Sequence, residues 1–194
     1  MKGKFGEPIL YLSMAFFSSL VKKRLSEQRV ASIFVNGLVK TVELGFADVA
    51  NLINDDPDFA VSPKIATTDD NAFLLITLTG NIKLMSDRFD GEQELRVRRA
   101  IIEQCAQLFE TDYDVFGNIY REYSDLMMRH NYPSKNILYA MSKAVFVKYD
   151  LIQYQADYFK SLKTPNPLIL KRMNEIMANF IWDWDSFLEK YKVS

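Results

Sequence analysis

"TTDDNAFLLITLTGNIKLMSDRFD", residues 67–90, is the stretch of sequence that decides the fold. Thr77 and Thr79 favour a strand, and Gly80 with Asn81 suits the two-residue turn of a hairpin. Apolar residues in the same stretch also recur at alternating spacings of three and four, which places them on one helix face: Leu75, Leu78, Ile82, Met85 and Phe89. We predict a helix here, and a short β-hairpin over residues 72–86 is the alternative.

Helix signals continue on both sides of this stretch. Thr67 and Asp70 have the spacing of a capping box that would begin the helix. Ser26 suits the cap of an earlier helix over residues 26–54. The segment "NDDPDFAVSPK" between the two helices is rich in turn-forming residues, so we expect a surface loop near residues 54–68.

The N-terminal segment predicts a further helix over residues 8–24, because Pro8 suits a first helical turn. This helix is apolar nearly all round, which is typical of a central or interface position. Its apolar run is shorter than the roughly 20 residues of a membrane span, and basic residues follow it at 22–24. We therefore expect a cytoplasmic protein and no membrane partner.

The second half of the chain is helical in pattern throughout. Apolar periodicity predicts helices over about 92–109, 112–131, 134–162 and 167–188, with Asn166 as the cap of the last and Pro167 as its first residue. Only seven glycines and six prolines interrupt the 194 residues. The sequence therefore predicts a single all-α domain over residues 1–194, an antiparallel helical bundle of about six to seven helices.

The stretch "FETDYDVFGNIYRE", residues 109–122, resembles part of a calcium-binding loop at Asp112, Asp114 and Gly117. The fifth ligand position is Phe116, however, and the twelfth is Tyr123, so two anchoring oxygen ligands are missing. A helix start explains the same residues, with Thr111 as the cap and Asp114 three residues after it. We predict a joint between two helices and no metal site.

Catalytic and cofactor motifs are lacking in the sequence. His130 is the only histidine, which excludes paired Glu-x-x-His iron sites and zinc clusters. Cys105 is the only cysteine, and its place on an apolar helix face is typical of an inert, packed thiol. Neither glycine-rich phosphate-binding pattern occurs. We predict no catalytic residue, no cofactor and no bound metal.

Aromatic side chains off the inward helix stripes are the first candidate functional surface: Tyr139, Tyr149, Tyr154 and Trp182. Large rings with one polar tip are favoured where a protein meets a partner or a ligand, although core packing is the simpler interpretation. Gly37, Thr41 and Gly45 lie four residues apart in their helix, a spacing that allows a close helix contact or, together with His130, a pocket between helices.

Taken together, these features predict a non-catalytic helical protein–protein interaction or regulatory module. The partner would be another protein or a second copy of the chain, giving a homo-oligomer. The net charge of −1 provides no field that would recruit nucleic acid. The alternative is a small-molecule-binding protein or enzyme with an aromatic-lined pocket between helices.

Overall fold

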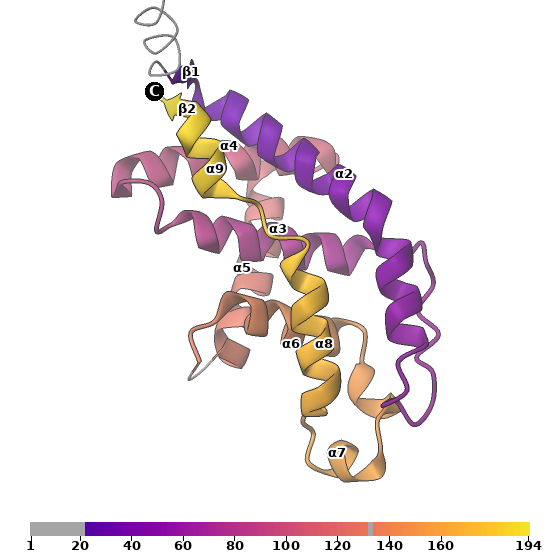
Figure 1. Cartoon of the computed structure of the whole chain (residues 1–194). Helices are drawn as coiled ribbons and strands as arrows, with labels where there is room; N and C mark the ends of the chain where they lie inside the picture. Colours follow the sequence, from indigo (N-terminus) through magenta and orange to yellow (C-terminus); the bar gives the residue numbers. More distant parts are fainter. Residues whose placement is uncertain (1–21, 132–133) are drawn as a thin grey trace, which may run out of the picture.

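The computed structural model describes residues 22–131 and 134–194, and within them eight α-helices account for most of the chain. In order, the elements are β1 (Lys23–Leu25), α2 (Glu27–Asn54), α3 (Asn71–Met85), α4 (Gly91–Leu108), α5 (Tyr113–Asn131), α6 (Ile137–Lys148), the 3-10 helix η1 (Leu151–Tyr154), α7 (Asp157–Ser161), α8 (Pro167–Ala178), α9 (Trp184–Lys190) and β2 (Tyr191–Val193). The predicted all-α helical bundle is confirmed (Figure 1).

The stretch that decided the fold is helix α3, which crosses the middle of the bundle (Figure 1). It contacts α2, α5 and α6, and even its polar residues Thr77, Thr79 and Asn81 are buried. The hairpin alternative over residues 72–86 does not form. The predicted capping box does not form either, because the Asp70 side chain makes no capping hydrogen bond.

Helix α2 is the longest element and runs along one edge of the molecule (Figure 1). Ser26 caps it as predicted, and its Oγ accepts a hydrogen bond from the Arg29 amide at 3.3 Å. One face is buried against α4 and α3 and includes Val30, Phe34 and Val42. By length and composition α2 is the one described helix that would be able to cross a membrane, but buried core helices of soluble proteins also satisfy this criterion.

The loop between α2 and α3 lies where the sequence predicts it and is attached at both ends. The side-chain amide of Asn54 donates to the Ile65 carbonyl at 2.9 Å and accepts from the Ile65 amide at 2.7 Å. Arg172 of α8 binds the carboxylates of Asp56, at 2.7 Å from its Nε, and Asp58. Ion pairs therefore hold the loop against α8, and two hydrogen bonds hold it against the end of α2.

The predicted helix over 134–162 is broken into three pieces, which corrects its predicted course. Asn136 caps α6, and α6 ends at Lys148. Asp150 then adopts a left-handed backbone conformation with φ of 49°, which cannot continue a helix. The short η1 and α7 follow as separate elements.

The predicted helix over 167–188 is also broken, although Asn166 and Pro167 begin it as predicted. Helix α8 ends at Ala178 and α9 begins only at Trp184. The buried side chain of Asn81 binds the Phe180 carbonyl and the Trp182 amide in the gap. These backbone groups gain partners in α3, so the segment forms a turn and an irregular connection between the two helices.

The two ends of the described chain meet in a two-stranded parallel sheet, with Lys23 opposite Tyr191 and Leu25 opposite Val193. The Ser194 amide donates to the Leu25 carbonyl at 3.0 Å and extends the pairing. The prediction that residues 23–24 end a helix is therefore wrong, because their backbone pairs with β2. Residues 8–21 of that predicted helix lie outside the described residues.

Candidate functional site

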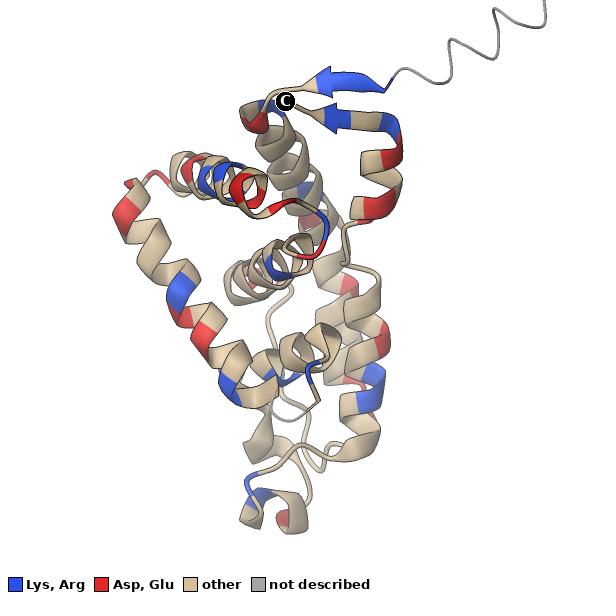
Figure 2. Ribbon diagram, turned by 90° about the vertical axis from the view of Figure 1, so that its left-hand side faces the viewer, with Lys and Arg blue, Asp and Glu red and all other residues tan. Residues whose placement is uncertain are grey.

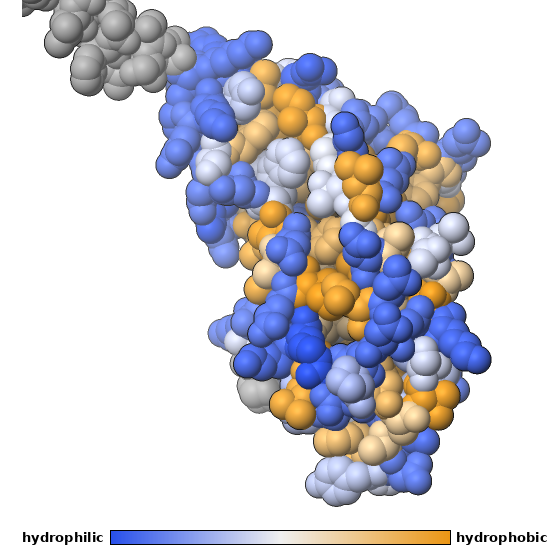
Figure 3. Space-filling view, turned by 45° about the vertical axis from the view of Figure 1, so that its right-hand side comes forward, coloured by the Kyte–Doolittle hydropathy of each residue, from blue (hydrophilic) through white to orange (hydrophobic). Residues whose placement is uncertain are grey.

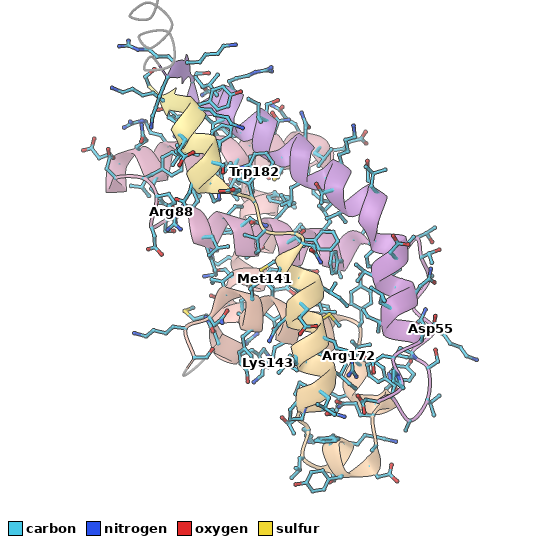
Figure 4. The ribbon with its side chains drawn as sticks, in the orientation of Figure 1. Asp55, Arg88, Met141, Lys143, Arg172 and Trp182 are labelled. Carbon is cyan, nitrogen blue, oxygen red and sulfur yellow. The ribbon has the colours of Figure 1, made fainter. Side chains whose placement is uncertain are left out.

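The small residues of α2 lie under aromatic rings of the same chain. A Cβ added to Gly37 would be 2.7 Å from Cζ3 of Trp182, and a Cβ added to Gly45 would be 3.1 Å from Cζ of Phe180. Figure 4 shows Trp182 between α2 and the C-terminal segment. The glycine spacing allows a close helix contact, but in the structure the rings of Trp182 and Phe180, from the irregular 179–183 segment, lie on these glycines instead of another helix.

Trp182 is half-buried in an aromatic group formed with residues of α2 and α9. Its ring packs edge-on against Phe34 with centroids 5.6 Å apart and against Trp184 at 6.2 Å. The Trp184 indole donates to the Asn81 carbonyl at 3.1 Å. The structure thus places Trp182 in contacts that attach the C-terminal segment to α2 and α3.

Tyr149 is also engaged within the chain. Its hydroxyl accepts from the Phe73 amide at 3.3 Å and donates to the Asp69 carbonyl at 2.6 Å. Burial raises the pKa of this hydroxyl, and the ring stacks on Phe46 with centroids 6.1 Å apart. Tyr149 therefore satisfies an orphan amide at the start of α3, in place of the predicted local capping box.

The remaining predicted residues lie apart from one another. Tyr154 accepts hydrogen bonds at its backbone carbonyl from residues 60 and 61 of the α2–α3 loop. The ring of Tyr139 makes a cation–π contact with the ammonium group of Lys143, which lies 4.5 Å from the ring centroid. Thr41 is exposed and donates its hydroxyl to the Gly37 carbonyl at 2.9 Å, a local bond within α2.

His130 and Cys105 occupy separate environments. Cys105 is fully buried in α4, and burial raises its pKa to about 12, so the thiol stays protonated at neutral pH. His130 lies in the last turn of α5 and lines a small pocket with Lys143 of α6, away from Gly37 and Gly45. Burial and the positive charges of Lys143 and Arg129 lower the His130 pKa.

The calcium-like stretch begins helix α5, and its capping residue differs from the predicted one. The Asp112 carboxylate accepts from the Val115 amide at 2.8 Å, so Asp112 is the cap and Thr111 is not. A carboxylate is favoured at this position because it also interacts with the positive end of the helix dipole. Within residues 22–131 and 134–194 no group of three or more acidic, histidine or cysteine side chains has an arrangement that could hold a metal ion.

A groove of about 710 Å³ lies between α4 and α5. We call it the α4–α5 groove. Arg98 and Arg99 line it from α4, and Arg121 lines it from α5. Figure 2 colours the basic and acidic residues on the ribbon, and both kinds alternate along the helices. Asp114 is the one carboxylate that lines the groove, so the lining is positively charged.

The arginines of the α4–α5 groove have partners within their own helices. Arg98 lies 3.4 Å from Glu94 and Arg99 lies 3.0 Å from Glu103. Arg121 donates to the neutral amide oxygen of Asn118 at 3.1 Å. The Arg99–Glu103 pair is exposed, and pairs of this kind contribute about 0–1 kcal/mol, so a ligand carboxylate can replace it at little cost. Glu94 is buried, so Arg98 keeps it as a partner.

Apolar side chains and one glycine complete the α4–α5 groove. Leu95 and Tyr113 are large and exposed, at 54% and 43% of their full surface. A Cβ added to Gly117 would meet no atom within 4 Å, so the groove is open above this residue. Arginine and tyrosine beside exposed apolar surface are the residue types that contribute most to protein interfaces.

A second exposed surface lies on the outer face of α2. Leu44, Asp48 and Leu52 follow one another at spacings of four, so they share a helix face, and Asp55, three residues after Leu52, is the C-cap residue directly after the helix. We call these four residues the α2 acidic stripe. Leu44 and Leu52 are 74% and 58% exposed, and both aspartates are exposed. Figure 3 shows, on the side of the molecule that α2 occupies, hydrophobic surface interrupted by hydrophilic side chains.

Sequence reasoning missed both surfaces. It named neither Arg98 nor Arg99 as a candidate, and it considered Gly117 only as part of a calcium-like loop. The available signal was the combination of a glycine inside a predicted helix with exposed tyrosine and arginine nearby. Arg121 of α5 lines the same groove as the arginines of α4. The spacing of residues within one helix cannot predict this, because it depends on how the two helices pack.

No family model, curated protein or solved structure matches this chain.

Proposed function

We propose that the protein is a non-catalytic helical interaction module that associates with itself in the cytoplasm. The α2 acidic stripe of one copy would lie in the α4–α5 groove of another. The observation that carries this proposal is the match between the two surfaces: one presents two leucines and two aspartates, and the other presents three arginines with Leu95 and Tyr113.

The physical basis is the docking of an amphipathic helix into a groove. Such helices present anchors at spacings of three and four, as the stripe does between Leu44 and Asp55. Leucine side chains would cover the apolar part of the groove, while Asp48 and Asp55 would reach the guanidinium groups. Arginine binds carboxylates through two parallel hydrogen bonds, which fixes the orientation of the docked helix.

The stripe and the groove are different surfaces, so two arrangements are possible. A reciprocal pair, in which each copy contributes a stripe and a groove, is an isologous two-fold dimer, whereas a one-way contact is heterologous and gives a ring or an open chain. The buried thiol of Cys105 and the absence of a second cysteine in the sequence are compatible with a reducing compartment.

Filling the groove provides the test. Gly117→Leu places a branched side chain where a Cβ meets nothing within 4 Å, so the fold tolerates it while the groove loses its open space. Gly117→Ala is the matched control, because it adds one methyl group at the same position. Sedimentation velocity over a concentration series should show association of the wild type and of Gly117→Ala, and at least tenfold weaker association of Gly117→Leu.

Circular dichroism of the three proteins establishes that helicity is unchanged. A wild-type protein that stays monomeric over the whole concentration series would overturn the proposal. Equal association of Gly117→Leu and Gly117→Ala would overturn the role of the groove.

A further inference from the structure

A second cavity lies at the opposite end of α5 from Gly117, where three elements meet. It has a volume of about 120 Å³ and is lined by His130 of α5, Lys143 of α6, and Lys163 and Thr164 of the α7–α8 connection. Phe146 and Ile152 form part of its apolar wall. A water molecule occupies about 30 Å³ of liquid, so the space holds a few waters or one small polyatomic ion.

The basic groups around this cavity have no acidic partner in the described part of the chain. Neither Lys143 nor Lys163 has a carboxylate within 4 Å among residues 22–131 and 134–194. Lys143 is instead held over the Tyr139 ring, with its Nζ 4.5 Å from the centroid. A lysine placed on an aromatic face keeps its charge and its hydrogen-bond donors available on the other side.

His130 lies in the same positively charged environment. Its pKa is lowered by burial first, and then by the charges of Lys143 and Arg129. Lys163 approaches from a third element. Positive groups collected around a small cavity with apolar walls favour an anion, because electrostatic attraction is stronger where water is partly excluded.

We infer that this cavity binds a small oxyanion, such as a phosphate or carboxylate group. Lys143 and Lys163 supply charged donors, the Thr164 hydroxyl supplies a neutral one, and His130 supplies a further charged donor once it is protonated. The site is separate from the α4–α5 groove and independent of self-association. The chemistry fits both a free anion and a phosphorylated side chain of a peptide.

The single histidine makes the test direct. In the NMR spectrum of the full chain, every imidazole C–H signal belongs to His130, because the sequence contains no other histidine. Titration with inorganic phosphate at constant ionic strength should shift this signal saturably. Bound anion should also raise the His130 pKa by about one unit, since a nearby negative charge favours the protonated ring.

Variants separate a built site from general charge effects. Lys143→Gln and Lys163→Gln should each weaken phosphate binding at least tenfold, whereas Lys171→Gln, on the exposed surface of α8, should leave it unchanged. A shift that does not saturate, or that is the same in wild type and Lys143→Gln, would mean an adventitious ion only and would overturn the inference.

Two further titrations identify the source of the anion. A phosphoserine peptide that binds more tightly than inorganic phosphate would point to a phosphorylated protein, and equal or weaker binding would point to a free anion. Acetate in place of phosphate distinguishes a carboxylate from a phosphate site. The absence of a saturable shift with all three probes would contradict the inference.

Discussion

The indole of Trp182 lies on Gly37 so closely that a Cβ at residue 37 would be 2.7 Å from its Cζ3. The glycine spacing of α2 and the off-stripe tryptophan are thus two sides of one contact within the chain. The ring is held by Phe34 and Trp184 as well, so it has little room to move. This contact helps to attach residues 179–194 to the bundle.

Two glycine-to-alanine substitutions should therefore have opposite effects on stability. Gly37→Ala should lower the free energy of unfolding by about 1–2 kcal/mol, because overpacking exceeds the gain in helix propensity. Gly117→Ala should raise it by about 0.5–1 kcal/mol, because its Cβ meets open space in the middle of α5. Urea unfolding of both variants measures the difference, and stabilisation by Gly37→Ala would contradict the packing described.

Removal of the Tyr149 hydroxyl should cost about 1 kcal/mol of stability. Tyr149→Phe leaves the Phe73 amide at the start of α3 without its acceptor, a loss comparable to that of a helix cap. Tyr158→Phe is the control, since this tyrosine is exposed on α7. Thermal unfolding followed by circular dichroism compares the two, and equal melting temperatures would argue against a capping role.

Asn81 should be among the most sensitive polar residues of the protein. Asn81→Ala removes the side-chain partners of the Phe180 carbonyl and the Trp182 amide, and should lower the free energy of unfolding by about 3 kcal/mol. Asn36→Ala removes one exposed hydrogen bond within α2 and should change it by less than about 0.5 kcal/mol. Hydrogen exchange should locate the increased opening in the 179–194 segment.

Alkaline pH should destabilise the protein partly through Cys105. The thiol pKa is 9.0 in the unfolded chain and about 12 in the fold, because burial disfavours the thiolate. Between these values the unfolded chain loses a proton that the folded one keeps, so stability falls by about 1.4 kcal/mol per pH unit. Below pH 9 the contribution is constant.

The Cys105→Ala variant isolates this effect. Its free energy of unfolding should decline less steeply than that of the wild type between pH 9 and pH 11, whatever its absolute stability. Parallel pH profiles of the two proteins would contradict the burial of the thiol.

Local sequence signals predicted the starts of α2 and α8. Ser26 and Asn166 cap α2 and α8 with their own side chains, and the periodicity of α3 outweighed its β-branched threonines. Tyr149 lies 76 residues from the amide that it binds, and Asn81 lies 99 residues from Phe180. The contacts of Asn81 lie in the break of the predicted 167–188 helix, and no pattern within one helix contains contacts of this kind.

The candidate sites were less predictable than the fold for the same reason. The α4–α5 groove depends on Arg98 and Arg121, which come from two helices that face one another. The small cavity at the end of α5 depends on His130, Lys143 and Lys163, which come from three elements. Spacing along the chain identified His130 as a candidate but not its neighbours. It also placed Trp182 and Tyr149 off their stripes, and in the structure both are held by contacts within the chain.

The measurement that tests self-association most directly exchanges charge between the two surfaces. Arg99→Glu/Arg121→Glu reverses the α4–α5 groove, and Asp48→Lys/Asp55→Lys reverses the α2 acidic stripe. Sedimentation velocity should show each double variant at least tenfold weaker in association than the wild type. An equimolar mixture should assemble again, because the intact stripe of one variant meets the intact groove of the other. A mixture that stays as dissociated as its components, or single variants that associate like the wild type, would contradict the account.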